Sequence, residues 1–211
     1  MVHILKSSAQ APRTFKSSEM VTVKGWKRFE TQENPSGRYG HRAICYMHKM
    51  ILFGGYNGKD RLNDTYEFDL GLFSQDIGCN LNKCGTEKRV WTRIDATTPS
   101  SNNNEPTVPS TSTTTTPAAR DCHSAVLYKR KMYVFGGGDG YKWLNDMFAY
   151  DIATQTWSEV KPSEGSLVPT GRAGHSAIVH KGKMIVFGGW NGRRTLNDLY
   201  EFYFGSFFFS K

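Results

Sequence analysis

Three segments of the 211-residue sequence repeat the same residues at the same offsets. Each segment starts with the pattern Arg-x-x-His, whose arginines are Arg38, Arg120 and Arg172. An apolar run, a Gly-Gly pair preceded by phenylalanine, and the tripeptide Leu-Asn-Asp follow in each copy without a gap. Self-similarity of this kind indicates that one supersecondary unit is stacked repeatedly along the chain. The repetition therefore constrains the fold more than any other feature.

The third copy shows most clearly which strands a unit contains. Residues 175–180 and 184–187 are short runs rich in β-forming residues, and a Lys-Gly-Lys turn separates them. The Gly-Gly pair ends the second strand, because glycine permits the positive φ of a close turn. A third strand is expected after Leu-Asn, and a fourth carries a tryptophan, Trp91 in the first copy and Trp157 in the second. Four antiparallel strands in each unit predict the blade of a β-propeller.

Together, Arg-x-x-His, the apolar hairpin, Gly-Gly, Leu-Asn-Asp and the tryptophan resemble the kelch repeat, in the style of Rab-effector-like and leucine-zipper-like-regulator proteins. The 52 residues that separate His123 from His175 agree with the kelch period, which is about 50 residues. The first copy departs from the pattern, because Arg42 stands where the other copies have serine. The resemblance implies an all-β fold, a partial kelch-type β-propeller of about three four-stranded antiparallel blades that is incomplete at the C-terminus.

The sequence also predicts how the chain is divided. We expect a disordered basic tail over residues 1–20, a partial kelch propeller over 21–204 and a short tail over 205–211. The expected parts of the propeller are an orphan outer strand 21–30, a blade 38–95 with an insertion 71–90, a disordered linker 96–119, a blade 120–160 and an incomplete blade 172–204. The linker is rich in Ser, Thr, Asn and Pro, with too few apolar groups to offset its ordering entropy. It is either a modified segment or a passive low-complexity expansion.

The predicted orphan strand 21–30 indicates that the blades of this chain alone do not close a propeller ring. It carries Trp26, and the other strands of its blade are not found upstream. A fragment, a truncated gene model or a splice product of a larger propeller would have this pattern. Such a chain exposes blade faces and strand edges, which favours self-association.

Residues that recur in every copy are expected to be structural, because a catalytic site normally needs one copy of each group. The repeated arginines are expected to tie loops together, and Asp64, Asp146 and Asp198 to accept backbone N–H groups at a turn. Function is then expected in the residues that differ between copies, on the loops of one face. The resemblance to kelch propellers implies that this face binds a protein partner. Apart from Ala173, the positions that match the contact positions of kelch propellers are Tyr39, Tyr56, Asn57, Asp121, Asp139, Tyr141, Trp190, Asn191, Arg193 and Arg194. The alternative is that each is an ordinary solvated loop residue.

A metal-dependent kelch enzyme of the oxidase or specifier type is the alternative function. The specifier type needs a Glu-x-x-x-Asp-x-x-x-His run, which the sequence does not contain. The four cysteines form no C-x-x-C pair, and the histidines of three separate blades would lie far apart around an axis. We therefore expect no catalysis, no cofactor and no metal site.

The net charge of +8 would suit an acidic partner or nucleic acid. Because the basic residues are scattered, the sequence favours a protein partner and no nucleic acid. No stretch is long enough to span a membrane, and the first twenty residues lack the apolar core of a signal peptide, although they weakly resemble a mitochondrial presequence. The expected location is the cytoplasm, with the nucleus as an alternative.

Overall fold

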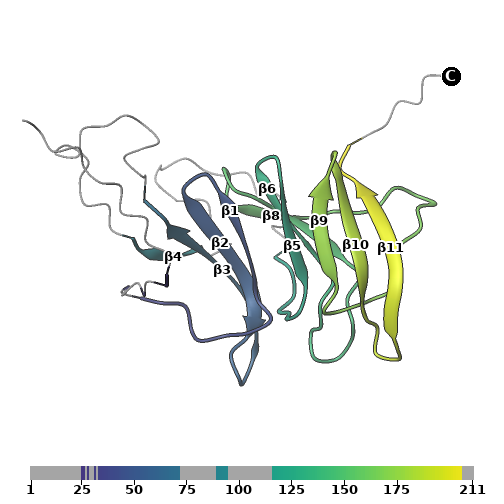
Figure 1. Ribbon diagram of the computed structural model, residues 1–211, viewed down its shortest axis with the longest axis horizontal. Helices are drawn as coiled ribbons and strands as arrows, with labels where there is room; N and C mark the ends of the chain where they lie inside the picture. Colours follow the sequence, from purple (N-terminus) through teal and green to yellow (C-terminus); the bar gives the residue numbers. More distant parts are fainter. Residues whose placement is uncertain are drawn as a thin grey trace, which may run out of the picture. The chain divides into compact units, whose positions relative to one another are not determined.

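The computed structural model describes residues 25–26, 28, 31, 33–71, 89–94 and 116–205. Within these ranges the regular structure consists of eleven strands in three antiparallel sheets (Figure 1). The first sheet contains β1 (Arg42–Tyr46), β2 (Lys49–Tyr56), β3 (Arg61–Asp69) and β4 (Trp91–Ile94). The second contains β5 (Ser124–Tyr128), β6 (Lys131–Phe135), β7 (Met147–Asp151) and β8 (Thr156–Glu159). The third contains β9 (Ser176–His180), β10 (Lys183–Trp190) and β11 (Thr195–Tyr203).

Each sheet is a meander, in which strands that follow one another in the chain are hydrogen-bonded neighbours. The sheets lie within the three predicted blade ranges, so we call them blades one, two and three. The predicted all-β class is confirmed, and so is the arrangement in antiparallel blades, the third of which has three strands among the described residues. The described residues contain no helix long and apolar enough to cross a membrane.

Several predicted segments lie outside the described residues. They are the tail 1–20, most of the insertion 71–90, most of the linker 96–119 and all but the first residue of the tail 205–211. In the predicted outer strand 21–30, only Gly25, Trp26 and Arg28 are described, and none of them is assigned to a strand. The outer strand therefore stays a prediction.

The repeated arginine and aspartate form the same ion pair in every blade. Arg120 Nη1 donates to Asp146 Oδ1 at 2.6 Å, and its Nη2 donates to Asp146 Oδ2 at 3.0 Å. The Arg120 side chain is fully buried, donates also to the carbonyl oxygens of Gly136 and Ala118, and lies over the Phe148 ring. The pairs Arg38–Asp64 and Arg172–Asp198 have the same two-bond geometry.

This geometry confirms that the arginines tie loops together. The sequence predicted backbone N–H groups as the partners of the aspartates, whereas the structure shows the guanidinium of the same repeat. A planar guanidinium presents two parallel N–H donors to a carboxylate, which is the geometry that lysine does not provide. The ion pair therefore fixes the Arg segment before the first strand against the Gly-Gly pair and the first residues of the third-strand segment of each blade.

Neighbouring blades are joined by main-chain hydrogen bonds. Gly55 N–H donates to the Arg120 carbonyl oxygen at 2.9 Å, and Arg120 N–H donates to the Leu62 carbonyl oxygen at 3.1 Å. Cys122 N–H donates to the Gly40 carbonyl oxygen at 2.8 Å. The same three bonds join blade two to blade three, from Gly137 to Arg172, from Arg172 to Leu144 and from Gly174 to Cys122. The repeat therefore encodes its junction with the next repeat in backbone groups.

Glycine is required at the first position of the Gly-Gly pair for two reasons. Gly54 has a φ of 65°, which L side chains rarely adopt. A Cβ atom there would also lie 2.9 Å from the Arg120 carbonyl oxygen of blade two. Gly136 repeats this arrangement against the carbonyl oxygen of Arg172. The glycine thus allows the next blade to approach.

The apolar core lies between the blades. Trp157 of β8 packs between blades one and two, with its ring centroid 4.8 Å from that of Phe53, and its indole N–H donates to Thr65 Oγ1 at 3.2 Å. Between blades two and three, Phe135 and Met147 pack with Met184 and other apolar residues. Both faces of blade two are therefore covered, as its continuous apolar strands predict.

The histidines of the repeat differ in their hydrogen bonds. His175 Nε2 lies 2.9 Å from Ser124 Oγ of the preceding blade. His123 faces blade one, where Arg42 stands in place of that serine, and neither of its ring nitrogens has a hydrogen-bond partner within the described residues. Burial, together with the charges of Arg120 and Arg42, lowers the pKa of His123 to about 3. The departure at Arg42 thus leaves a buried imidazole unpaired.

Replacing Arg42 with serine is expected to stabilise the chain by about 1 kcal/mol, because the hydroxyl would give His123 the bond that Ser124 gives His175. Urea denaturation followed by tryptophan fluorescence measures this as a higher midpoint at an unchanged slope. The matched variant Ser124→Ala removes the bond of His175 and should lower the midpoint. An Arg42→Ser protein no more stable than the wild type would contradict the assignment.

Candidate functional site

One set of loops lies at the same end of all three blades. Isolated antiparallel bridges pair Tyr39 with Tyr56, Asp121 with Gly138 and Ala173 with Trp190, so the residue after each repeated arginine lies beside the loop after each Gly-Gly pair. The bonds from Cys122 to Gly40 and from Gly174 to Cys122 join these segments across the blades. We call this surface the loop face, which consists of Tyr39, Tyr56–Arg61, Asp121, Gly138–Trp143, Ala173 and Trp190–Arg194.

Three of the predicted contact residues shape the loops themselves. Asn57 Oδ1 accepts the backbone N–H groups of Lys59 and Asp60 at 2.9 and 2.7 Å. Asp139 and Asn191 accept the corresponding N–H groups two and three residues later in their own loops. A side-chain oxygen that accepts backbone N–H groups in this way stabilises a turn. These residues therefore give the three loops a common conformation.

Arg61 joins the loops of blades one and two. Its Nε lies 3.0 Å from Asp121 Oδ1, and its guanidinium lies over the Tyr56 ring at 5.6 Å from the centroid. It also reaches the next loop, where a Cβ atom on Gly140 would lie 2.7 Å from Arg61 Nη1. Asp121, a predicted contact residue, is buried in this arrangement and so holds Arg61 in place.

Trp143 joins the loops of blades two and three. A Cβ atom on Gly192 would clash with Trp143 Nε1, so the indole lies directly against the backbone of the third loop. Its six-membered ring also lies against Gly138. Trp143 and Arg61 are not among the predicted contact residues, although each ends a loop whose residues differ between the copies. Their position at the end of a variable loop could have identified both residues from the sequence.

The exposed groups of the loop face are aromatic and cationic. Tyr39, Tyr141 and Trp190 are exposed, and the Tyr39 and Tyr56 rings meet edge to face at 5.5 Å. Arg193 and Arg194 are exposed on the third loop. Of the predicted contact residues, the structure thus places Tyr39, Asn57, Tyr141, Trp190, Arg193 and Arg194 in the open, with Tyr56, Asp139 and Asn191 half-buried and Asp121 buried.

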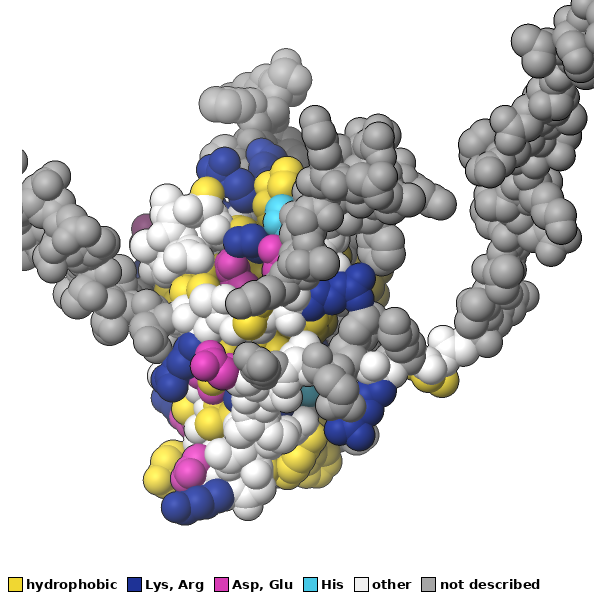
Figure 2. All heavy atoms as spheres, turned by 90° about the vertical axis from the view of Figure 1, so that its left-hand side faces the viewer, with side chains coloured by type: hydrophobic (Ala, Val, Ile, Leu, Met, Phe, Trp, Pro, Cys, Tyr) yellow, Lys and Arg dark blue, Asp and Glu magenta, His cyan; other side chains and the backbone are white. Residues whose placement is uncertain are grey.

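Cationic side chains outnumber acidic ones on the loop face. Five cations, Lys59, Arg61, Lys142, Arg193 and Arg194, accompany three anions, Asp60, Asp121 and Asp139. On the surface seen in Figure 2, dark blue basic groups are interspersed with acidic, apolar and uncharged groups. The excess of cations on the loops would attract acidic side chains and speed their encounter.

Metal-ligating groups do not gather among the described residues. No cluster of three or more His, Cys, Asp or Glu side chains that could hold a metal ion is found there. Cys45 and Cys122 are free thiols, while Cys79 and Cys84 lie outside the described ranges.

The chain resembles known kelch proteins over most of its length. The profile of the KLHDC2/KLHL20/DRC7 Kelch-repeats domain matches residues 20–211. The chain is 30% identical over 219 residues to the Leucine-zipper-like transcriptional regulator 1 homolog of Drosophila melanogaster, an alignment that covers 86% of this chain and 21% of that protein. It is 32% identical to human Host cell factor 2, with 78% and 19% covered.

A third relative is human Kelch domain-containing protein 3, which is 31% identical over 180 residues, with 80% of this chain and 38% of that protein covered. The chain thus spans between about one fifth and two fifths of the length of these relatives. The three sheets, the repeated Arg–Asp pairs and the matched profile lead to one conclusion. The chain belongs to the kelch-repeat family.

Proposed function

We propose that this chain is a protein-interaction module that binds a protein partner through its loop face and catalyses no reaction. The observation that carries the proposal is that exposed aromatic and arginine side chains, which differ between the copies, stand on loops that Arg61 and Trp143 hold together. Such side chains dominate the binding energy of protein interfaces. A rigid scaffold that displays variable loops also loses little entropy on binding.

The charge of the loops defines the kind of partner further. We propose a peptide segment that contributes acidic side chains to Arg193 and Arg194 and an apolar side chain to Tyr141 and Trp190. The proposed compartment is the cytoplasm, with the nucleus as the alternative.

A selection of short peptides from a displayed library on the immobilised chain tests the proposal. For selected peptides we expect the double variant Tyr141→Ala/Trp190→Ala to raise the Kd about 30-fold, the equivalent of about 2 kcal/mol. Titration calorimetry of synthetic peptides measures this change. Arg193→Ala/Arg194→Ala should slow association and reduce its dependence on salt.

Arg130→Ala is the matched control, because Arg130 is an exposed cation in the turn between β5 and β6, at the other end of the strands. Its peptide affinity should equal that of the wild type. Thermal melting establishes that all variants are folded. Selected peptides that bind the loop variants as tightly as the wild type would disprove the loop site.

A further inference from the structure

One face of blade three is exposed to solvent, whereas the equivalent faces of blades one and two are covered by the next blade. Ile44, Phe53 and Thr65 of blade one are 9%, 0% and 2% exposed because blade two packs on them. Their counterparts in blade three, Ile178, Phe187 and Leu199, are 60%, 51% and 61% exposed. The open face is thus built as an inter-blade surface, with apolar side chains at the positions that are buried elsewhere.

The backbone of this face also repeats the groups that join one blade to the next. In blade one these groups are the Leu62 and Gly40 carbonyl oxygens and the Gly55 N–H. Their counterparts in blade three are the carbonyl oxygens of Leu196 and Gly174 and the N–H of Gly189, which have no inter-blade partner among the described residues. Ser176, the counterpart of the serine that bonds His175, is exposed.

Blade one carries the complementary groups on its opposite face. Arg38 is the counterpart of Arg120 and Arg172, whose main-chain N–H and C=O groups are hydrogen-bonded to the preceding blade. Within the described residues, the main-chain N–H and C=O groups of Arg38 form no hydrogen bond to another blade. His41 holds the position of His175, whose Nε2 bonds the serine of the preceding blade. Ala43, whose counterpart Ala177 packs against blade two, is exposed.

We propose that blade three of one copy of this chain binds blade one of a second copy, head to tail, and that two copies close a ring of six blades. The junction would repeat the two that the structure shows, with the second copy's Arg38 bonded to Leu196 and Gly189 and its His41 to Ser176. Propellers contain roughly four to eight blades, and head-to-tail contacts form a closed ring when their rotation permits. Two copies of three blades satisfy that range.

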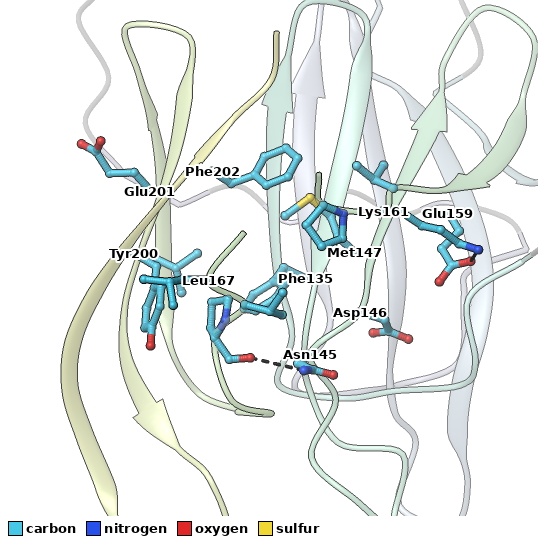
Figure 3. A pocket seen from close by; sticks show the side chains of 15 residues that line it. Phe135, Asn145, Asp146, Met147, Glu159, Lys161, Leu167, Tyr200, Glu201 and Phe202 are labelled. Atoms are coloured by element: carbon cyan, nitrogen blue, oxygen red, sulfur yellow. Dashed lines mark hydrogen bonds and ion pairs between the residues drawn. The ribbon is translucent and has the colours of Figure 1, made fainter. Parts of the chain in front are cut away.

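A cavity lies beside β11, at the edge of blade three where a fourth strand would pair. It measures about 120 Å³, and Phe135, Met147, Val186 and Phe202 are among the residues that line it (Figure 3). Their counterparts one repeat earlier are Phe53, Thr65, Val134 and Tyr150, which are the residues around Trp157. The cavity is therefore the place where a tryptophan from a fourth strand of blade three would lie.

Sedimentation velocity at micromolar concentration tests the ring. The wild type should have twice the monomer mass of 23.8 kDa. Phe187→Asp, which charges the open face of blade three, and Ala43→Glu, which charges the free face of blade one, should each give monomers. Both residues are exposed in the single chain, so neither change should prevent folding, and circular dichroism verifies this.

Mixing the two charged variants distinguishes head-to-tail pairing from a symmetric contact. The mixture retains one intact junction, between blade three of Ala43→Glu and blade one of Phe187→Asp, so it should form heterodimers. Tyr141→Ala, which removes an exposed aromatic side chain from the loop face, should remain dimeric. A monomeric wild type, a species that grows with concentration beyond a dimer, or a mixture that stays monomeric would each overturn the proposal.

Discussion

Replacing Arg120 with alanine should lower the free energy of unfolding by about 3 kcal/mol, because it removes a fully buried guanidinium and leaves the partly exposed Asp146 carboxylate and the buried Gly136 carbonyl oxygen without their donor. The side chain is fully buried and makes four hydrogen bonds, two to Asp146 and one each to the carbonyl oxygens of Gly136 and Ala118. Alanine removes all four and also the contact with the Phe148 ring. Urea denaturation monitored by tryptophan fluorescence measures the loss.

One variant separates the two-bond geometry of Arg120 from its charge, and a second gives the loss expected for an exposed ion pair. Arg120→Lys keeps the charge but cannot bond both carboxylate oxygens and the carbonyls, so it should recover only part of the stability. Lys131→Ala breaks an ion pair with Asp151 of 3.7 Å in which the lysine is 44% exposed, and exposed pairs contribute about 0.2–1 kcal/mol. A loss for Arg120→Ala as small as that for Lys131→Ala would refute the assigned role.

Lowering the pH from 7.5 to 5 should destabilise the chain by about 2 kcal/mol for each of His123 and His175. Burial, as the largest cause, lowers the folded-state pKa of these histidines to about 3 and about 4. The ordinary value, 6.5, applies to the unfolded chain. Below pH 6.5 the unfolded chain therefore binds more protons than the folded chain, and stability falls as the pH falls.

The decline should begin near pH 6.5 and continue toward the folded-state values. Denaturation midpoints at a series of pH values between 7.5 and 5 measure it. His123→Phe keeps an aromatic ring against Phe53, whose centroid lies 5.5 Å away, and should remove about half of the decline. His180→Gln changes an exposed histidine and should leave the decline unchanged. An equal decline in the His123→Phe and wild-type proteins would show that His123 is not the titrating group.

The blades could be predicted because a strand and its turn are local in sequence. The offset between Arg38 and Asp64 repeats in every copy, but an offset of 26 residues does not reveal a bond, so the partner of the aspartates was missed. The change from serine to Arg42 was visible in the sequence. Its effect on His123 was not, because the two residues lie 81 positions apart and meet only across a junction between blades.

The position of the loop face could also be predicted from the sequence, because its residues follow repeated ones. Which of these residues are exposed could not be predicted. Tyr39, Tyr141 and Trp190 were selected because they follow repeated residues, and the structure places them exposed at one end of the blades. The same rule selected Asp121, which is buried because Arg61 of the preceding blade reaches it. A rule based on position within one repeat cannot separate the two cases, because the neighbouring repeat decides them.

The junctions between blades affect how a kelch-repeat protein can evolve by duplication of a blade. Their hydrogen bonds join main-chain atoms, chiefly those of the repeated Arg, Leu and Gly residues. A duplicated copy of the gene segment for one blade would therefore arrive with its attachment to both neighbours already encoded. Substitutions on the loops would leave that attachment intact, so binding specificity could diverge from copy to copy while the architecture was inherited unchanged.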